Sequence, residues 1–229
     1  MSYAMVTLQE LDVSKITFGK PKQNQYKATN IPIYYQKEDK NIPLYISLKA
    51  CSAPFGIYPN REFNDGKKIN GYGISFSMNE TYSEKIKGLD QYLIETAYQN
   101  RKSWGLNEKI PKQSISGYDE FGTEGKYKRL LKYPYHINNN GEKVYDVNKY
   151  LPRIDTKIIS NLNEEPHQLD VVAFDDKREK VDSLTSKNYK SSLPAGSKVS
   201  SILLLSRISI GTYGIVLKPI AKQLLIKKG

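Results

Sequence analysis

The sequence predicts a mainly β protein with one inserted α-helix and long polar loops. Three observations predict this class: short or alternating apolar runs dominate the chain, one stretch has helical spacing, and clusters of Gly, Pro, Asn and Asp separate the runs. The 229 residues suffice for one large β domain with a core, and no Gly/Ser- or Pro-rich linker divides them. We therefore expect a single domain over residues 1–229, with its core at about residues 31–226.

The predicted strands are apolar runs bounded by turn residues. They span residues 31–36, 42–51, 72–78, 127–135, 154–160, 169–174, 198–208 and 213–226. Pro219 interrupts the last run, and because proline cannot donate to a strand ladder we expect a bend, a bulge or a sheet edge there. The predicted turns lie at residues 64–66, 138–141, 175–177 and 194–196 and at Gly211.

One helix is predicted, over residues 83–102. Its apolar residues, Ile86, Leu89, Leu93 and Ala97, fall on one stripe at helical spacing. Ser83 has the residue type of an N-cap, and Gly105 is suited to end the segment. Residues 108–125 are polar and are predicted to form a loop.

Basic residues outnumber acidic ones: 35 Lys and Arg against 24 Asp and Glu give a formal net charge of +11. Such an excess favours polyanionic partners, namely nucleic acid or an anionic membrane surface. The excess is largest over residues 187–229, which hold eight Lys or Arg and no Asp or Glu. The alternative is that solubility and an AT-rich genome account for a composition rich in Lys, Asn and Ile.

The sequence also indicates the cellular compartment in which the protein works. A single cysteine, Cys51, excludes an internal disulfide and fits a reducing environment. The first residues lack the basic and apolar regions of a secretory signal, and the longest apolar run, residues 202–205, is too short to span a membrane. We expect an intracellular protein without a membrane partner, in the host cytoplasm or the viral replication compartment of an infected cell.

Few residues are available for metal or nucleophile chemistry. The chain has two histidines, His136 and His167, and one cysteine, so a structural zinc site is not expected. Cys51 lies in an apolar run and is predicted to be a buried structural thiol. Residues 122–126 lack the glycine spacing of a phosphate loop and the Ser or Thr after its lysine. We expect no cofactor, no metal and no catalytic residue.

The enzymatic alternative is a metal-dependent nuclease. Four carboxylates lie near Lys180 and belong to a class that can hold Mg²⁺ for phosphodiester cleavage. They are Asp170, Asp175, Asp176 and Glu179. A turn after a strand favours the same residue types, and this simpler interpretation is preferred. An RNA-binding protein and a DNA-packaging structural protein are the remaining alternatives.

Binding a single strand without a sequence code needs a positive groove for the phosphates and aromatic faces on which bases stack. Residues 126–135 supply both, with four basic residues and no acidic one. If this segment is one extended strand, alternate residues share a face. One face would then carry Arg129, Leu131, Tyr133 and Tyr135, and the other Lys128 and Lys132.

Other basic–aromatic patches extend the candidate surface. They are Tyr150, Arg153 and Lys157; Arg101, Lys102 and Trp104 at the exit of the predicted helix; and Arg207, Tyr213 and Lys218 on the C-terminal strands. Trp104, in a predicted loop beside two cations, is a candidate stacking platform. For each aromatic residue, packing in the core is the alternative to base stacking. Taken as a set, the patches predict binding of single-stranded nucleic acid.

The order of these parts resembles the single-stranded-DNA-binding proteins of tailed phages and of large eukaryotic DNA viruses. The resemblance covers most of the chain, about residues 31–226, as an order of elements with short tracts. The tracts are the predicted helix 83–102 followed by Trp104, residues 132–135, residues 150–153 leading into 155–159, residues 169–175, and the strand pair that opens at Gly196 and ends at Ile226.

This resemblance implies an OB-like β-barrel that carries the inserted helix. It implies non-sequence-specific coating of single-stranded DNA during replication, recombination or repair, without a cofactor. It implies a replicative polymerase as a partner, and a helicase and further copies of the chain are additional candidate partners. Phage members usually end in an acidic tail, whereas this chain ends LIKKG, so the tail-based mechanism is not carried over.

Overall fold

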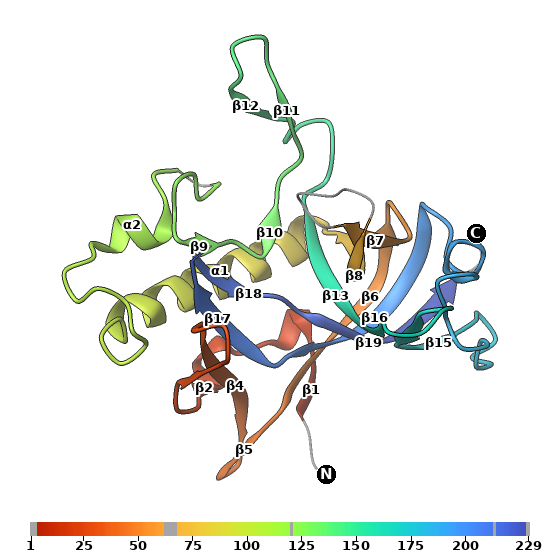
Figure 1. Cartoon of the computed structure of the whole chain (residues 1–229), viewed down its shortest axis with the longest axis horizontal. Helices are drawn as coiled ribbons and strands as arrows, with labels where there is room; N and C mark the ends of the chain where they lie inside the picture. Colours follow the sequence, from red (N-terminus) through yellow and green to blue (C-terminus); the bar gives the residue numbers. More distant parts are fainter. Residues whose placement is uncertain (1–3, 62–67, 120, 213, 228–229) are drawn as a thin grey trace.

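The computed structural model describes residues 4–61, 68–119, 121–212 and 214–227. Two β-sheets share the core with one long helix, and a β-hairpin projects from the body (Figure 1). The predicted turn at residues 64–66 and the predicted site residue Tyr213 lie outside the described residues. Within them, no helix is long and apolar enough to cross a membrane.

The larger sheet follows a path of strands in which each is hydrogen-bonded to the next. In order they are β1 (Ala4–Thr7), β6 (Leu44–Ala53), β16 (Ser197–Leu205), β19 (Ile220–Lys227), β13 (Arg153–Asn161), β8 (Ile69–Ser77) and β7 (Ile57–Arg61). The short strands β10 (Leu131–Lys132) and β14 (Gln168–Asp170) pair with β13, and β15 (Val172–Phe174) pairs with β19. The mainly β class is confirmed, and over the described residues the path of paired strands is open between β7 and β1.

The smaller sheet takes the N-terminal strands and part of the C-terminal region. Its path runs through β2 (Ile16–Phe18), β4 (Thr29–Lys37), β17 (Arg207–Gly211), β18 (Gly214–Leu217) and β9 (Tyr127–Lys128), while β3 (Lys22–Gln23) and β5 (Lys40–Ile42) pair with β4. The chain crosses between the sheets at Ser206 and again at Pro219. Each of the two predicted C-terminal strands is therefore split in two, and the predicted break at Pro219 is confirmed.

The predicted helix is confirmed as α1 (Glu80–Gln99), three residues closer to the N-terminus than expected. Its N-cap is Asn79, whose side chain accepts from the Tyr82 amide, and Ser83 is instead buried in the first turn. The predicted apolar stripe is buried, and Ile86 and Leu89 line the same small apolar void in the core as Ile46 of the larger sheet. The remaining helices are the short α2 (Lys112–Ser116), within the predicted loop, α3 (Tyr189–Ser192), and two 3₁₀ turns, Leu8–Glu10 and Val13–Lys15.

The prediction of one strand over residues 127–135 is wrong, and a buried carboxylate explains why. Asp90 of α1, 1% exposed, accepts hydrogen bonds from the Tyr127 hydroxyl (2.8 Å) and from the Leu130 and Leu131 amides (2.9 and 3.3 Å). Burial raises the pKa of Asp90 against the opposing effect of these bonds. Because two consecutive amides are turned toward α1, the chain leaves the extended path between β9 and β10.

The projecting hairpin is formed by β11 (Tyr135–Ile137) and β12 (Lys143–Tyr145). The predicted turn at residues 138–141 joins them, with the Asn138 amide donating to the Glu142 carbonyl. We call residues 134–146 the arm; its base is closed by a hydrogen bond from the Asp146 amide to the Pro134 carbonyl. Figure 1 shows the arm standing clear of both sheets above β10.

Candidate nucleic-acid interface

A groove of about 950 Å³ opens at the base of the arm. Its walls come from β9, β10, the arm, Asp119 and the loop at residues 121–124. Four cationic side chains line it, Lys128, Arg129, Lys132 and Lys143, and so do four aromatic side chains that reach the surface, Phe121, Tyr133, Tyr135 and Tyr145. The buried Tyr127 is a fifth aromatic residue of its lining. The carboxylates of Asp119, Glu124 and Glu142 line it as well. The groove thus combines positive charge with aromatic faces, the two features that bind single strands.

Four aromatic rings of the groove form one packed cluster around Phe121, and the other three belong to Tyr133, Tyr135 and Tyr145. The Phe121 and Tyr145 rings are stacked, with centroids 3.8 Å apart and planes 16° apart, and Tyr133 meets Phe121 edge-on at 5.0 Å. Tyr135 meets Tyr145 edge-on at 5.9 Å and remains 49% exposed. The Lys143 ammonium lies 4.7 Å from the Tyr135 ring centroid. Mutual packing holds the rings in place while leaving Tyr135 accessible to a base.

Arg129 holds the loop that carries Phe121. Its guanidinium donates to the Ser116 and Asp119 carbonyls, at 3.3 and 3.4 Å. Gly122 has a φ of +76°, and a Cβ there would lie 2.7 Å from the Arg129 Nε, so a residue without a side chain is needed. Arg129 was expected to contact phosphate, and its hydrogen bonds indicate a supporting role beneath the groove instead.

Lys132 joins the groove to the outer face of the larger sheet. It lies directly opposite Arg153 in the pairing of β10 with β13, and residues paired in this way share a face. Along β13 the outward Arg153, Asp155 and Lys157 alternate with buried residues, as a half-buried strand requires. Burial lowers the pKa of Lys132, because desolvation disfavours the charged ammonium. The structure thus brings the predicted Lys132, Arg153 and Lys157 together.

Two aromatic residues on this face were missed by the sequence reasoning. Phe55 is 54% exposed, and the Arg153 guanidinium lies 5.5 Å from its ring centroid. Tyr58 of β7 meets Phe55 edge-on at 6.4 Å, and its ring lies over Gly73, where a Cβ would be 3.1 Å from it. The sequence signal was available, because an aromatic residue set between Pro54 and Gly56 belongs to a turn rather than to a strand core.

A series of side-chain hydrogen bonds holds Arg153 close to the Phe55 ring. The Ser75 hydroxyl donates to Asp155 Oδ1 at 2.7 Å, and the Tyr58 hydroxyl lies 3.0 Å from the Ser75 oxygen. Arg153 Nε lies 3.4 Å from the same Asp155 oxygen. We define the sheet face as Phe55, Tyr58, Arg153 and Lys157, and these hydrogen bonds position Tyr58 and Arg153 within it.

The predicted patch at the helix exit is structural. Trp104 is 3% exposed and packs edge-on against Phe18 at 5.4 Å, so it is a core residue rather than a stacking platform. Arg101 donates to the Glu108 and Tyr98 carbonyls, which fastens the end of α1. Lys102 is exposed and pairs with Glu108 at 3.2 Å. A residue that closely follows two cations in the sequence can thus still be the one that fills the core.

The two remaining predicted residues have different surroundings. Tyr150 is exposed in the segment between the arm and β13, and the Lys149 ammonium lies 5.0 Å from its ring centroid. Arg207 is exposed on β17, opposite Pro32 in the smaller sheet, and does not line the groove. Tyr150 extends the candidate interface, whereas Arg207 lies apart from it.

The carboxylates considered for a nuclease make local contacts. Asp175 Oδ1 accepts from the Lys177 and Glu179 amides, at 3.0 and 2.8 Å, which confirms the predicted turn. Asp170 pairs with Lys222 at 2.8 Å. Over the described residues, no group of three or more His, Cys, Asp or Glu side chains is placed to hold a metal ion. Cys51 is buried as predicted, and burial raises the pKa of its thiol to about 11.

Comparison with solved structures finds similar chains, two of which are the following. One is the "Single-stranded DNA-binding protein from bacteriophage Enc34 in complex with ssDNA", 15% identical, matched over 91% of this chain and 94% of that one with a TM-score of 0.45. The other is a C-terminal truncation of the same phage protein, 14% identical, matched over 93% and 95% with a TM-score of 0.44. No protein-family model and no curated protein sequence matches the chain. Both structural neighbours belong to the class that the sequence resemblance named.

Proposed function

We propose that this chain coats single-stranded DNA without sequence preference, on an OB-like scaffold, and so protects the strand during replication, recombination or repair. One observation carries the proposal: the cationic and aromatic side chains form one surface that runs from the sheet face through Lys132 into the groove. Arg153 makes the link, since it lies over Phe55 and opposite Lys132.

The cationic and the aromatic side chains of the interface bind different parts of a nucleotide. The ammonium and guanidinium groups attract phosphates, which every nucleotide presents, and the rings offer faces to bases at about 1–3 kcal/mol each. Stacking tolerates any base because all four have a π-face, so the surface binds without reading sequence. The surface needs no catalytic group, metal or cofactor to do this.

The proposal is tested by fluorescence anisotropy of labelled oligo-dT, titrated with protein and then challenged with unlabelled competitors. We expect oligo-dT to compete well and duplex DNA of matched length to compete poorly, because paired bases cannot reach the rings. If duplex competes equally well, charge alone accounts for the binding and the stacking mechanism is wrong. Equal competition by poly-rU would assign single strands of both kinds as ligands.

A matched pair of variants locates the binding. Phe121→Ala removes the ring at the centre of the groove cluster, and Tyr26→Ala removes an exposed tyrosine of the loop between β3 and β4. We expect the first to weaken binding and the second to leave it unchanged. If both variants bind as the wild type does, the groove is not the binding site.

A further inference from the structure

The smaller sheet has a charge that the groove and the sheet face leave unexplained. Over the described residues, its seven strands contain cationic residues and no Asp or Glu. The cationic residues are Lys22, Lys37, Lys40, Lys128 and Arg207. The larger sheet, by contrast, carries carboxylates at Asp155 and Asp170. A sheet without carboxylates attracts polyanions such as nucleic acid.

One row of paired residues crosses the outer face of the smaller sheet. Lys128 of β9 pairs with Val216 of β18, and Val216 pairs with Ser209 of β17. Ser209 pairs with Asn30 of β4, and Asn30 pairs with Lys22 of β3. Paired residues share a face, and these are exposed or partly exposed while their inward neighbours are buried, namely Ile31, Ile208, Ile215 and Tyr127. The steps between adjacent strands make the row roughly 19 Å long.

Lys128 joins this row to the groove. It lines the groove, and a Cβ at Gly214 would lie 3.4 Å from its Cε, so the side chain lies against β18. Its ammonium donates to the Gly125 carbonyl at 3.1 Å and keeps further N–H groups for a phosphate. In Figure 1, β9 lies beside β10, and β18, β17 and β4 lead away from it. The groove and the outer face of the smaller sheet therefore meet at Lys128.

Two further cations and an amide lie on this face. Arg207 is exposed on β17, two residues from Ser209 and so on the same side of the sheet. Lys218 is exposed directly after β18. The Ser209 hydroxyl donates to Asn30 Oδ1 at 2.7 Å, so Asn30 meets a ligand through its N–H groups. Arginine, lysine and asparagine side chains all donate to phosphate oxygens in protein–DNA contacts.

We propose that a single strand longer than the groove and the sheet face continues past Lys128 onto the smaller sheet. We define the basic face as Lys22, Asn30, Arg207 and Lys218, and these residues bind the phosphates of the added length. The inference rests on the proposed function, because the groove holds the first part of the strand. A strand that fills only the groove and the sheet face does not reach the basic face, so its binding is independent of these residues.

The basic face adds phosphate contacts rather than stacked bases. Among the described outward residues of β4, β9, β17 and β18, the only aromatic ring belongs to Tyr34, which is partly exposed. Phosphate contacts release counterions and stacking does not, so each added contact should steepen the salt dependence by about 0.7 in log–log slope. The salt dependence of long strands is therefore the property that reports on the basic face.

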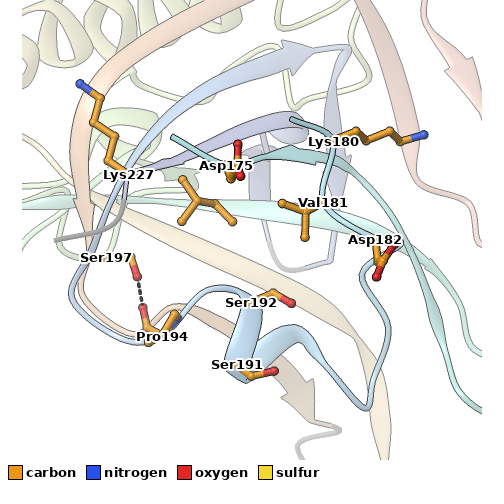
Figure 2. A pocket seen from close by; sticks show the side chains of 10 residues that line it. Asp175, Lys180, Val181, Asp182, Ser191, Ser192, Pro194, Ser197 and Lys227 are labelled. Carbon is orange, nitrogen blue, oxygen red and sulfur yellow. Dashed lines mark hydrogen bonds between the residues drawn. The ribbon is translucent and has the colours of Figure 1, made fainter. Parts of the chain in front are cut away.

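The far end of the molecule offers a matched control. A cavity of about 710 Å³ lies there between the loop that follows β15, the helix α3 and the end of β19 (Figure 2). Its lining carries both charges, Asp175 and Asp182 with Lys180 and Lys227, so it lacks the uniform charge of the basic face. Lys227 is exposed at the end of β19, away from β4 and β9 in Figure 1. Lys227→Ala thus removes an exposed strand lysine outside the proposed path.

The test compares two lengths of oligo-dT that each bind one copy, within the roughly 4–16 nucleotides that one OB fold covers. The short strand is the shortest that binds, and the long strand is the longest that still binds a single copy. We expect the slope of log affinity against log salt to be steeper by about 2 for the long strand, because Lys22, Arg207 and Lys218 each add about 0.7. The slope is the readout because the extra registers of a longer strand raise affinity equally at every salt concentration.

The double variant Arg207→Ala/Lys22→Ala should remove about 1.4 of this difference, and Lys227→Ala should retain it. Both variants should bind the short strand as the wild type does, which also shows that they are folded. Equal slopes for the two lengths in the wild type, or a difference that the double variant retains, would overturn the basic face as part of the path. Failure of the wild type to bind the short strand would instead overturn the proposed function.

Discussion

Tyr135 is the exposed ring of the groove, and it tests the stacking mechanism at the scale of one residue. Tyr135→Ala should weaken oligo-dT binding by about 1–3 kcal/mol, or roughly 5- to 150-fold, because one stacked base loses its partner. Thermal unfolding should change little, since the side chain is half exposed. The measurement is anisotropy at several salt concentrations. A change in the salt dependence with unchanged affinity at high salt would contradict the assigned role.

The titration of Lys132 should make the affinity for oligo-dT depend on pH. Its pKa lies below the ordinary lysine value of 10.5 because burial disfavours the charge, and a bound phosphate favours the charge. Below the lowered pKa the lysine is already charged and affinity is independent of its titration; above it, affinity falls as the pH rises. Lys132→Arg keeps its charge to a higher pH, so its affinity should begin to fall later than that of the wild type. Identical profiles for the two proteins in oligo-dT titrations would exclude Lys132 from the interface.

At the residue scale, the positions of the charged residues could be predicted from the sequence, but the exposure of individual aromatic residues could not. Lys132, Tyr133, Tyr135, Arg153 and Lys157 were predicted as binding residues because basic and aromatic residues interleave. The structure places the first three in the lining of the groove and Arg153 opposite Lys132, while their contact with nucleic acid stays a prediction. Trp104 was misplaced because two cations lie two and three residues before it in the sequence, whereas in space it packs on Phe18. Burial depends on contacts far along the chain, which local composition does not encode.

Asp90 sets the geometry of an element, the junction between β9 and β10. Asp90→Ala would leave the Tyr127 hydroxyl and two amides buried without an acceptor, and should lower the free energy of unfolding by about 3 kcal/mol. Asp90→Asn keeps an acceptor oxygen and should cost less. Urea unfolding measures both. Equal stability of wild type and Asp90→Ala would show that Asp90 does not hold the junction.

At the scale of elements, the helix and the longer strands were predictable, and the breaks within runs were not. The stripe of α1 and the apolar runs of β4, β6, β8 and β13 follow local periodicity. The run at residues 127–135 has strand periodicity as well, but a carboxylate on α1 takes its amides. The run at residues 169–174 likewise divides into β14 and β15, which pair with different strands. In both cases tertiary contacts overrode local preference.

The whole molecule should bind through a few phosphates despite its net charge of +11. The interface cations proposed to reach phosphate are Lys128, Lys132, Lys143, Arg153 and Lys157. If each meets one phosphate, log affinity should fall against log salt with a slope of about −3 to −4. Lys157→Ala should reduce the slope by about 0.7, and Arg207→Ala, on the smaller sheet, should leave it unchanged. Equal effects of the two variants would mean that charge acts through the molecule as a whole.

The shape of the proposed interface could not be predicted from the sequence. Its residues lie between positions 55 and 157, and pairings between distant strands bring them to one surface. We propose that single-stranded DNA lies along the groove and the sheet face. The direct measurement is photocrosslinking of oligo-dT that carries 5-iodouracil, with the adducts mapped by mass spectrometry. We expect adducts at Phe55, Tyr133, Tyr135 and Tyr145. Adducts confined to the smaller sheet around Arg207, or none on the groove and sheet face, would show that the strand lies elsewhere on the molecule.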